Sequence, residues 1–401
     1  MSLIVNRRWL LELPAVLLVN LLLLELLLQL LYWLTSGGGW LAARVSPPIY
    51  AENPTLGIYG LRPDFTYRHT TNEFSVPIVI DGRGMRVTRR PTSSTAGDQV
   101  PMRSGLTVVA SGPSYGFGWG SDNQVSYYSR MATVLAERLR LPVRLLNISV
   151  PSQSSGLQLC RLQQEMSKDR PALVMITVYG GLQNLEPQCR RATSLQVWNH
   201  ELVTGRPTLL SRTKALLRQS AIVFYGYSLY GLLAGQSAMV APMGQQDYRP
   251  QLGIDPRRQI EAYAAAVRRS LGPVPLLFVR VPLAYEVHPE HLARWRSNAS
   301  PEVLQRQAAT DAAGWRALRG QQPSLQLQGI YLLDPMALLR AGADMGQAQY
   351  YRLDTHFTPA GNASVAAALA RDPALPLLVQ DVRRYSSSLT APSASLPPMQ
   401  K

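Results

Sequence analysis

The stretch from Leu106 to Gly120, LTVVASGPSYGFGWG, decides how this chain folds. It begins as a short apolar run rich in β-branched residues, as a strand buried on both faces does. It ends in a Gly-rich turn, and the segment 124–139 that follows has its apolar residues at helical spacing. A buried strand that turns directly into a helix is typical of a parallel α/β sheet.

The same alternation continues along the chain. Further strand-like runs are VRLLNIS (143–149), ALVMITV (172–178), VPLLFVRV (274–281) and IYLLD (330–334). Segments of helical spacing lie between or after them, at 155–167, 257–271, 301–318 and 360–370. Strands that alternate with helices of about 10–15 residues predict a parallel sheet covered on both faces. We therefore predict an α/β protein, built as a three-layer α/β/α sandwich.

Changes in composition divide the chain. Residues 1–35 contain a short N-terminal segment and an apolar span. Residues 36–54 contain a Gly triplet and adjacent prolines, which are typical of a linker, and residues 55–385 are predicted to form the α/β domain. An insertion near 198–250 interrupts the alternation with AIVFYGYSLYGLLAG, which is short for a second membrane span. We expect a helix there, near the mouth of the site and dipping toward lipid. The Ser- and Pro-rich tail 386–401 is predicted to be disordered.

The apolar span from Leu13 to Leu34 is long enough to cross a bilayer, because each helical residue adds about 1.5 Å and the hydrocarbon core is about 30 Å thick. Arg7 and Arg8 precede it, and Tyr32 begins its aromatic far end. This flanking predicts a single-pass protein with a cytoplasmic N-terminus and a periplasmic or otherwise extracytoplasmic main domain. A cleavable signal peptide is the alternative, and the length of the apolar stretch favours the uncleaved anchor.

Glu25, Gln29 and Tyr32 fall on one face of this predicted helix. A carboxyl group at membrane depth costs several kcal/mol unless it is neutralised or paired. We suggest that this face meets another transmembrane helix, which another membrane subunit could supply. The alternative is a protonated Glu25 that a Leu-rich helix simply tolerates.

Charge and cysteine usage limit the partners. Lys and Arg exceed Asp and Glu by 40 to 25, a formal charge of +15, without a dense basic block. This excess fits either a solvated basic surface or contact with anionic lipid or acidic glycan, and a membrane anchor argues against nucleic acid. Cys160 and Cys189 form one disulfide outside the cytoplasm or remain separate buried thiols. We found no motif for a metal, nucleotide or other cofactor and predict that none is needed.

One candidate nucleophile stands at the end of the first strand. Ser114 follows a glycine there, and functional groups of a parallel sheet gather at the carboxyl ends of its strands. A serine needs a base, and His356 precedes the last predicted helix of the α/β alternation, with Asp354 two residues earlier to orient it. The remaining histidines lack such a setting: His69, His200, His288 and His291.

Four segments, in this order, resemble the blocks of SGNH (GDSL-type) hydrolases: ASGPSYGFGWG, VRLLNISVPSQSSGLQL, PALVMITVYGGLQN and LDTHFTPAG. The upstream NEFSVPIVIDGRGMR is similar to a segment that precedes this domain in membrane-anchored bacterial members. The resemblance implies a flavodoxin-like SGNH fold. It also implies that Ser114 is the nucleophile, His356 the base and Asp354 its orienting acid.

The sequence departs from the family pattern in three places. Pro113 replaces the Asp of the first block, and it fixes φ just before Ser114, a constraint able to turn that serine away from His356. Ser152 replaces a Gly whose backbone N–H helps to hold the oxyanion. Gly181 replaces an Asn of the third block, so Gln183 or Asn184 would be displaced substitutes. The implied oxyanion set is therefore Ser114, Ser152, Gly181 and Asn184, and one missing donor costs about 10²–10³ in rate.

Two functional hypotheses follow. The first is a membrane-anchored serine esterase or O-acyltransferase that acts on acylated glycan or lipid, which the retained Ser114, Asp354 and His356 favour. The second is an inactive SGNH-like pseudo-enzyme that serves as a binding or structural subunit of a membrane complex, docked through the Glu25 face. The three departures from the family pattern, at Pro113, Ser152 and Gly181, favour the second hypothesis.

Overall fold

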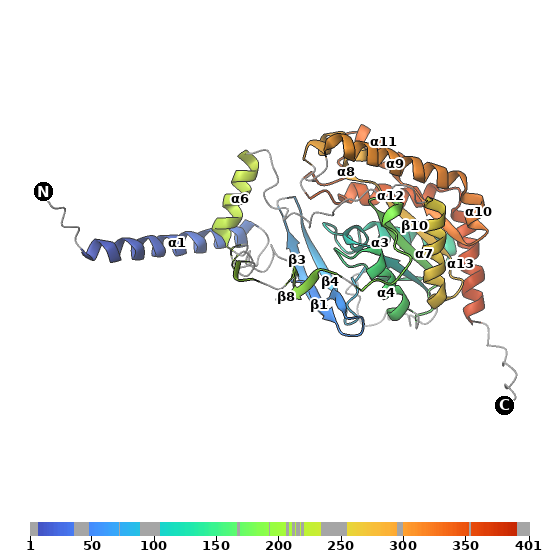
Figure 1. Ribbon diagram of the computed structural model, residues 1–401, viewed down its shortest axis with the longest axis horizontal. Helices are drawn as coiled ribbons and strands as arrows, with labels where there is room; N and C mark the ends of the chain where they lie inside the picture. The colour runs from blue at the N-terminus through green and yellow to red at the C-terminus, as the bar shows by residue number, and fades with distance from the viewer. Residues whose placement is uncertain are drawn as a thin grey trace, which may run out of the picture.

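The structure is a computed structural model that describes residues 7–35, 48–71, 73–88, 105–166, 169–191, 193–205, 208–210, 213, 217, 220–233, 255–294, 300–352 and 354–390. A long N-terminal helix, α1 (Arg7–Thr35), projects from one side of an α/β domain (Figure 1). Within α1, the stretch Glu12–Leu34 is long and apolar enough to cross a membrane.

A five-stranded parallel sheet forms the centre of the domain, in the order β11-β10-β7-β5-β6. Its strands are β5 (Leu106–Ser111), β6 (Val143–Asn147), β7 (Leu173–Tyr179), β10 (Leu276–Val281) and β11 (Ile330–Leu333). The interior strands β7 and β10 are buried almost throughout, as expected of strands covered on both faces. Numbered along the sheet by chain order, the strands run 2-1-3-4-5, which is the flavodoxin-like order. The predicted α/β fold is confirmed.

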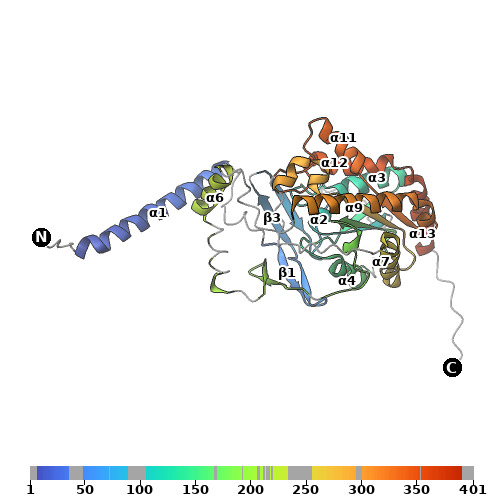
Figure 2. The same ribbon diagram turned by 45° about the horizontal axis from the view of Figure 1, so that its top comes forward.

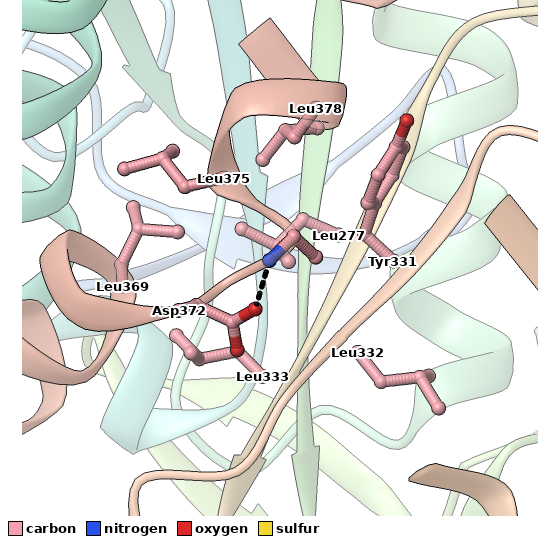
Figure 3. A pocket seen from close by; sticks show the side chains of 9 residues that line it. Leu277, Tyr331, Leu332, Leu333, Leu369, Asp372, Leu375 and Leu378 are labelled. Carbon is pink, nitrogen blue, oxygen red and sulfur yellow. Dashed lines mark hydrogen bonds between the residues drawn. The ribbon is translucent and has the colours of Figure 1, made fainter. Parts of the chain in front are cut away.

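Helices cover both faces of this sheet (Figures 1 and 2). One hydrophobic cluster joins the sheet to α3 (Tyr127–Leu139), α8 (Ala284–Val287), α11 (Met336–Asp344), α12 (Pro359–Arg371) and α13 (Leu375–Thr390). A second joins the other face to α4 (Ser155–Glu165), α7 (Pro256–Leu271), α9 (Pro301–Gly320) and α10 (Gln322–Gln326). Packing between β10, β11 and the C-terminal helices is close and leaves a gap of only about 10 Å³. Figure 3 shows the side chains that line this gap.

Helix starts follow from local chemistry. The Oγ atoms of Ser126 and Ser154 accept backbone N–H groups at the starts of α3 and α4, and the Asp255 carboxylate does so for α7. Thr358 caps α12 in the same way. These are the residue types that best satisfy the free N–H groups of a first helical turn. The caps also place the turns that precede them, including the one that carries His356.

Short antiparallel strands precede the central sheet in the chain. They pair as β1 (Tyr50–Asn53) with β2 (Ile58–Leu61) and β3 (Phe65–Thr70) with β4 (Ser75–Ile80). A third hydrophobic cluster packs them against the loop after β6 and the first turns of α4. The predicted linker 36–54 is thus wrong at its end, because β1 lies within it. Residues 36–47 fall outside the described part of the chain.

The C-terminal boundary also differs from the prediction. Residues 386–390 belong to α13, whose apolar face packs on the sheet layer through Leu375, Leu378 and Val382. The predicted disordered tail therefore starts too early, and residues 391–401 fall outside the described residues. The structure also pairs Cys160 with Cys189, which the sequence left open. This disulfide ties α4 to the segment that leads into the insertion.

The insertion contains a hairpin as well as a helix. Strands β8 (Leu195–Trp198) and β9 (Glu201–Thr204) pair antiparallel and pack on the β1–β2 hairpin. Helix α6 (Ala221–Leu233) packs instead on α1, across the face that holds Glu25 (Figure 1). The Glu25 face therefore meets a helix of its own chain, where we had suggested another subunit. Residues 234–254 lie outside the described part.

Candidate active site

Ser114 begins the short helix α2 (Ser114–Phe117), immediately beyond the carboxyl end of β5. Its Oγ lies 2.7 Å from Nε2 of His356, and Nδ1 of that histidine lies 2.6 Å from Oδ1 of Asp354. Folding thus brings Ser114 into contact with His356, 242 positions later in the chain, and His356 contacts the Asp354 that precedes it by two positions. This arrangement lets His356 take the serine proton while Asp354 fixes the imidazole.

Pro113 does not turn Ser114 away. It stands at the N-cap of α2 with a φ of −75°, an ordinary value for proline, and its carbonyl accepts the N–H of Phe117. Proline is tolerated at a helix start because no hydrogen bond to its nitrogen is needed there. The constraint at Pro113 therefore does not turn the Ser114 hydroxyl away from His356.

The Asp354 carboxylate is fixed from several sides. Its Oδ2 accepts the indole N–H of Trp119 at 3.3 Å, and its backbone N–H donates to Oε2 of Glu73 at 2.7 Å. Burial alone would raise the pKa of Asp354, but the charge and hydrogen bond of His356, with a contribution from His69, lower that pKa below its ordinary value. Asp354 is therefore held as the carboxylate that a catalytic imidazolium needs.

Aromatic rings enclose the histidine. Tyr115 packs at 4.5 Å from the His356 ring and donates its hydroxyl to the carbonyl of Thr355. His356 is only 1% exposed and Ser114 is 8% exposed, so the pair is largely shielded from water. Such shielding strengthens the electrostatic interactions in the site.

His69 is a further buried histidine beside the triad. Its ring contacts Trp119 edge to face at 4.4 Å and Phe74 at 4.9 Å. Burial lowers the pKa of His69 to about 4, against the opposing charge of Asp354. His69 is therefore neutral at pH 7 and supports the indole that contacts Asp354. No pattern in the sequence marks His69 for this role, because β3 is far from Ser114 and His356 along the chain.

Arg86 holds the loop that follows Ser114. Its buried guanidinium donates to the carbonyls of Phe117, Gly118 and Ser121, and to Oδ1 of Asn123. It also lies 4.6 Å from the centre of the Phe117 ring. Burial lowers the pKa of Arg86 to about 9, which still leaves it charged at pH 7. The segment upstream of the domain thus fixes the backbone next to the nucleophile.

The expected oxyanion residues lie beyond the ends of β6 and β7. Ser152 has a φ of 65° and Gly181 a φ of 101°. The first value is left-handed, which explains why the family uses glycine there, and serine adopts it at a cost of roughly 1–2 kcal/mol. Tyr59 stabilises that turn by donating its hydroxyl to the Ser152 carbonyl at 2.6 Å. The roles of the backbone N–H groups of Ser114 and Ser152 stay predictions.

Asn184 does not replace the missing amide. Its side-chain nitrogen donates to the carbonyls of Tyr179 at 3.3 Å and Gly180 at 2.7 Å. Both amide hydrogens are therefore engaged within the turn, and this side chain is not free to donate to an oxyanion. The side chain of Gln183, the other suggested substitute, lies outside the described part of the structure.

A cavity of about 560 Å³ borders the loop that carries Asp354 and His356. Tyr351, Arg352 and Thr358 of that loop line it, together with Glu73, His288, Glu290 and His291. The lining mixes aromatic, basic and acidic groups, which suits a ligand rich in hydroxyl groups. In the described residues, no three His, Cys, Asp or Glu side chains gather as ligands of a metal ion.

Comparison with known proteins supports the same family. Residues 246–385 match the model of the SGNH hydrolase-like domain of acetyltransferase AlgX, a range that includes Asp354 and His356. No curated protein sequence matches the chain significantly.

Solved structures with some similarity include TesA, with 14% identity, coverage of 69% of this chain and 99% of that chain, and a TM-score of 0.33. The lipase Lip_vut3 from a goat rumen metagenome has 13% identity, coverage of 66% and 95%, and a TM-score of 0.37. A variant of Axe2, an acetylxylan esterase from Geobacillus stearothermophilus, has 11% identity, coverage of 67% and 94%, and a TM-score of 0.35.

The family resemblance rests on three observations that agree. The sheet has the flavodoxin-like strand order, the hydrogen-bonded Ser114, His356 and Asp354 lie at its carboxyl edge, and the C-terminal third matches the family model. The α/β domain of this chain therefore resembles the SGNH-type hydrolases in its sheet order, in the geometry of this site and in the sequence of its C-terminal third.

Proposed function

We propose that this chain is a membrane-anchored serine esterase or O-acyltransferase that acts on acylated glycan or lipid outside the cytoplasm. The observation that carries the proposal is the continuous hydrogen-bonded chain from Asp354 through His356 to Ser114. A buried serine hydroxyl with this pair of partners is an activated nucleophile.

The reaction has two halves. Ser114 Oγ attacks the ester carbonyl carbon and its proton passes to Nε2 of His356, while Asp354 stabilises the imidazolium. The tetrahedral intermediate then expels its alcohol, which takes the proton from His356 and leaves an acyl-serine. Water or a sugar hydroxyl next gives its proton to His356 and attacks the acyl carbon, and Ser114 leaves with that proton. Hydrolysis and acyl transfer differ only in the acceptor of the second half.

Two features support a glycan acceptor. The cavity beside the triad loop offers Tyr351 for stacking and Arg352 for polar contact with a sugar. The matching family model is that of an acetyltransferase, so an acetyl ester is the donor we favour. The apolar stretch of α1 supports anchoring, and the basic residues Arg7 and Arg8 before it support the outward orientation of the domain.

A fluorophosphonate probe on the full-length protein in detergent tests the proposal. We expect covalent labelling, and hydrolysis of p-nitrophenyl acetate, that Ser114→Ala lowers by about 10⁵-fold or more, as for other triad serines. Ser324→Ala is the matched control, since Ser324 lies in α10 and its hydroxyl only contacts the carbonyl of Gln321. Wild-type protein that is folded, yet neither labelled nor active, would contradict the proposal.

One observation favours the second candidate, an inactive binding subunit. Both hydrogens of the Asn184 amide are engaged within the turn, so that position supplies no side-chain donor to an oxyanion. If backbone donors alone are too weak, the triad would be retained without turnover. In that case the probe labels neither the wild type nor Ser114→Ala, although both bind an acylated oligosaccharide.

A further inference from the structure

Helix α6 is tied to α1 through one carboxylate. Glu25 Oε1 accepts the backbone N–H of Ala221 at 2.7 Å, and Oε2 accepts that of Ile222 at 3.0 Å and the hydroxyl of Ser220 at 2.7 Å. Gln29 donates to the same carboxylate from one turn along α1, at 2.8 Å. A side chain of α1 thus satisfies N–H groups that the first turn of α6 would otherwise leave unbonded.

Ring packing extends the contact toward the outer end of α1. Tyr32 and Phe224 meet edge to face at 5.7 Å, and both side chains are buried in this contact, as is Ala221. Beyond it, α6 runs across α1 and away from it (Figure 1). Only the first part of α6 is therefore covered by protein in the described structure.

The rest of α6 presents apolar side chains outward. Leu229 is 56% exposed and Tyr230 is 61% exposed, and Leu209, Leu210 and Leu217 of the segment before α6 are also exposed. Helix α6 itself, AIVFYGYSLYGLL, contains no charged residue. Soluble proteins rarely expose apolar side chains in such concentration without a partner. This surface adjoins the exposed leucines of α1, which the proposed function places in lipid.

The depth of the contact identifies the partner. Glu25 lies nine residues before Leu34, the end of the apolar stretch, which at about 1.5 Å per residue is roughly 14 Å along the helix. If α1 spans the bilayer, α6 therefore starts within the hydrocarbon region. Backbone N–H groups cannot remain unbonded there, and the Glu25 carboxylate supplies the acceptors that they need.

We propose that α6 is a second lipid-contacting element, which lies in the outer half of the bilayer and is docked on α1 by Glu25. Its partner is the acyl-chain region of the membrane. The inference rests on the membrane anchor of the proposed function and is independent of the triad. With two attachments rather than one, the catalytic domain is held at a set height and rotation over the membrane surface.

Site-directed spin labelling of the full chain in phospholipid nanodiscs tests this proposal. The described residues contain no free cysteine, so Leu229→Cys gives a single reactive thiol. We expect its nitroxide to be accessible to oxygen and shielded from a water-soluble nickel chelate. Leu22→Cys in α1 is the control for lipid, and Leu327→Cys, which is 91% exposed in the α/β domain, is the control for water.

The outcomes separate the two proposals. A label at 229 that matches the one at 22 supports α6 in lipid. A label at 229 that matches the one at 327, with 22 still in lipid, overturns the α6 proposal and leaves the anchor in place. If the label at position 22 is also accessible to the nickel chelate, both the anchor and the α6 proposal fail. Labelling of Ser114 by the fluorophosphonate does not depend on that result.

Limited trypsin digestion in nanodiscs tests the role of Glu25. Arg212, Lys214 and Arg218 precede α6 and offer cleavage sites. We expect Glu25→Ala to raise the cleavage rate in this segment about tenfold, because α6 loses its cap and dissociates locally. Glu25→Gln keeps one acceptor oxygen, so its cleavage rate should lie between those of wild type and Glu25→Ala. Asn20→Ala is the matched control, since Asn20 donates only to Val16 in its own helix. Equal rates for Glu25→Ala and wild type would overturn the docking role.

Discussion

Two carboxylates, Asp354 and Glu25, have similar patterns of hydrogen bonding and different roles. Each accepts hydrogen bonds from residues far away in the sequence: Asp354 from Trp119, and Glu25 from Ser220 and the turn that follows. Each also has a partner close by in the chain, His356 in the first case and Gln29 in the second. Both are therefore fixed by tertiary contacts that no local pattern contains.

The difference lies in what the donor can do with its proton. The imidazole of His356 has a second nitrogen, which contacts Ser114, so a proton can enter on one side while Asp354 stabilises the charge from the other. The backbone N–H groups of Ala221 and Ile222 do not transfer their protons, and their hydrogen bonds to Glu25 only fix the start of α6. The same carboxylate chemistry thus supports a reaction in one region and an architecture in the other.

Exchanging each carboxylate for its amide gives the largest contrast between the two regions. Asp354→Asn should lower kcat/KM for p-nitrophenyl acetate by about 10⁴-fold, because an amide favours the wrong tautomer of His356. Glu25→Gln should leave this value within about twofold of wild type, since Glu25 touches no reacting group. Steady-state kinetics in detergent measure both. A comparable loss in both variants would show that the two regions are coupled.

The pH dependence of stability probes the surroundings of the triad. The pKa of His69 falls from an ordinary 6.5 to about 4 on folding, so above pH 6.5 both states are neutral and His69 contributes no pH dependence. As the pH falls from 6.5 toward 4, only the unfolded chain takes up the proton, and the folded state loses up to about 3 kcal/mol.

His69→Phe should therefore flatten the loss of stability between pH 6.5 and 4, while it keeps the ring contact with Trp119. Urea denaturation at a series of pH values measures this, with His200→Phe in the insertion hairpin as the control. An unchanged slope in His69→Phe would show that the acid sensitivity arises elsewhere.

The smallest expected effect comes from the indole that orients Asp354. Trp119→Phe removes a single long hydrogen bond to Oδ2 and keeps most of the ring packing, so kcat should fall by about tenfold with little change in KM. Trp198→Phe, in β8, serves as the control for a tryptophan outside the site. A rise in KM at constant kcat would instead place Trp119 in substrate binding.

Much of the fold was predictable because its signals are local. Strands such as Leu276–Val281 are continuous apolar runs, and Ser154 and Thr358 are recognisable helix caps. The boundaries of the segments were less predictable. Strand β1 lay inside the predicted linker, and residues 386–390 of α13 were assigned to the tail, because their composition is polar and the apolar partners lie elsewhere in the chain.

The candidate site was predictable only in part. Ser114 and His356 were found because both stand beside helix starts, at positions that the family pattern marks. Trp119, His69 and Arg86 were missed as site residues, and the sequence did not reveal that the Asn184 amide donates to the carbonyls of Tyr179 and Gly180. Each of these depends on which groups meet across the sheet edge, and spacing along the chain contains no information on that.

The sequence by itself determined the kinds of element and their order, because periodicity and turn chemistry act over a few residues, and its resemblance to a family singled out Ser114, His356 and Asp354 as candidates. Only the tertiary structure decided that Pro113 leaves Ser114 facing His356, that Cys160 pairs with Cys189, and that Glu25 meets α6 of its own chain. The physical reason is that hydrogen bonds and ring contacts depend on distances of a few ångströms between atoms. Packing of the whole chain sets those distances.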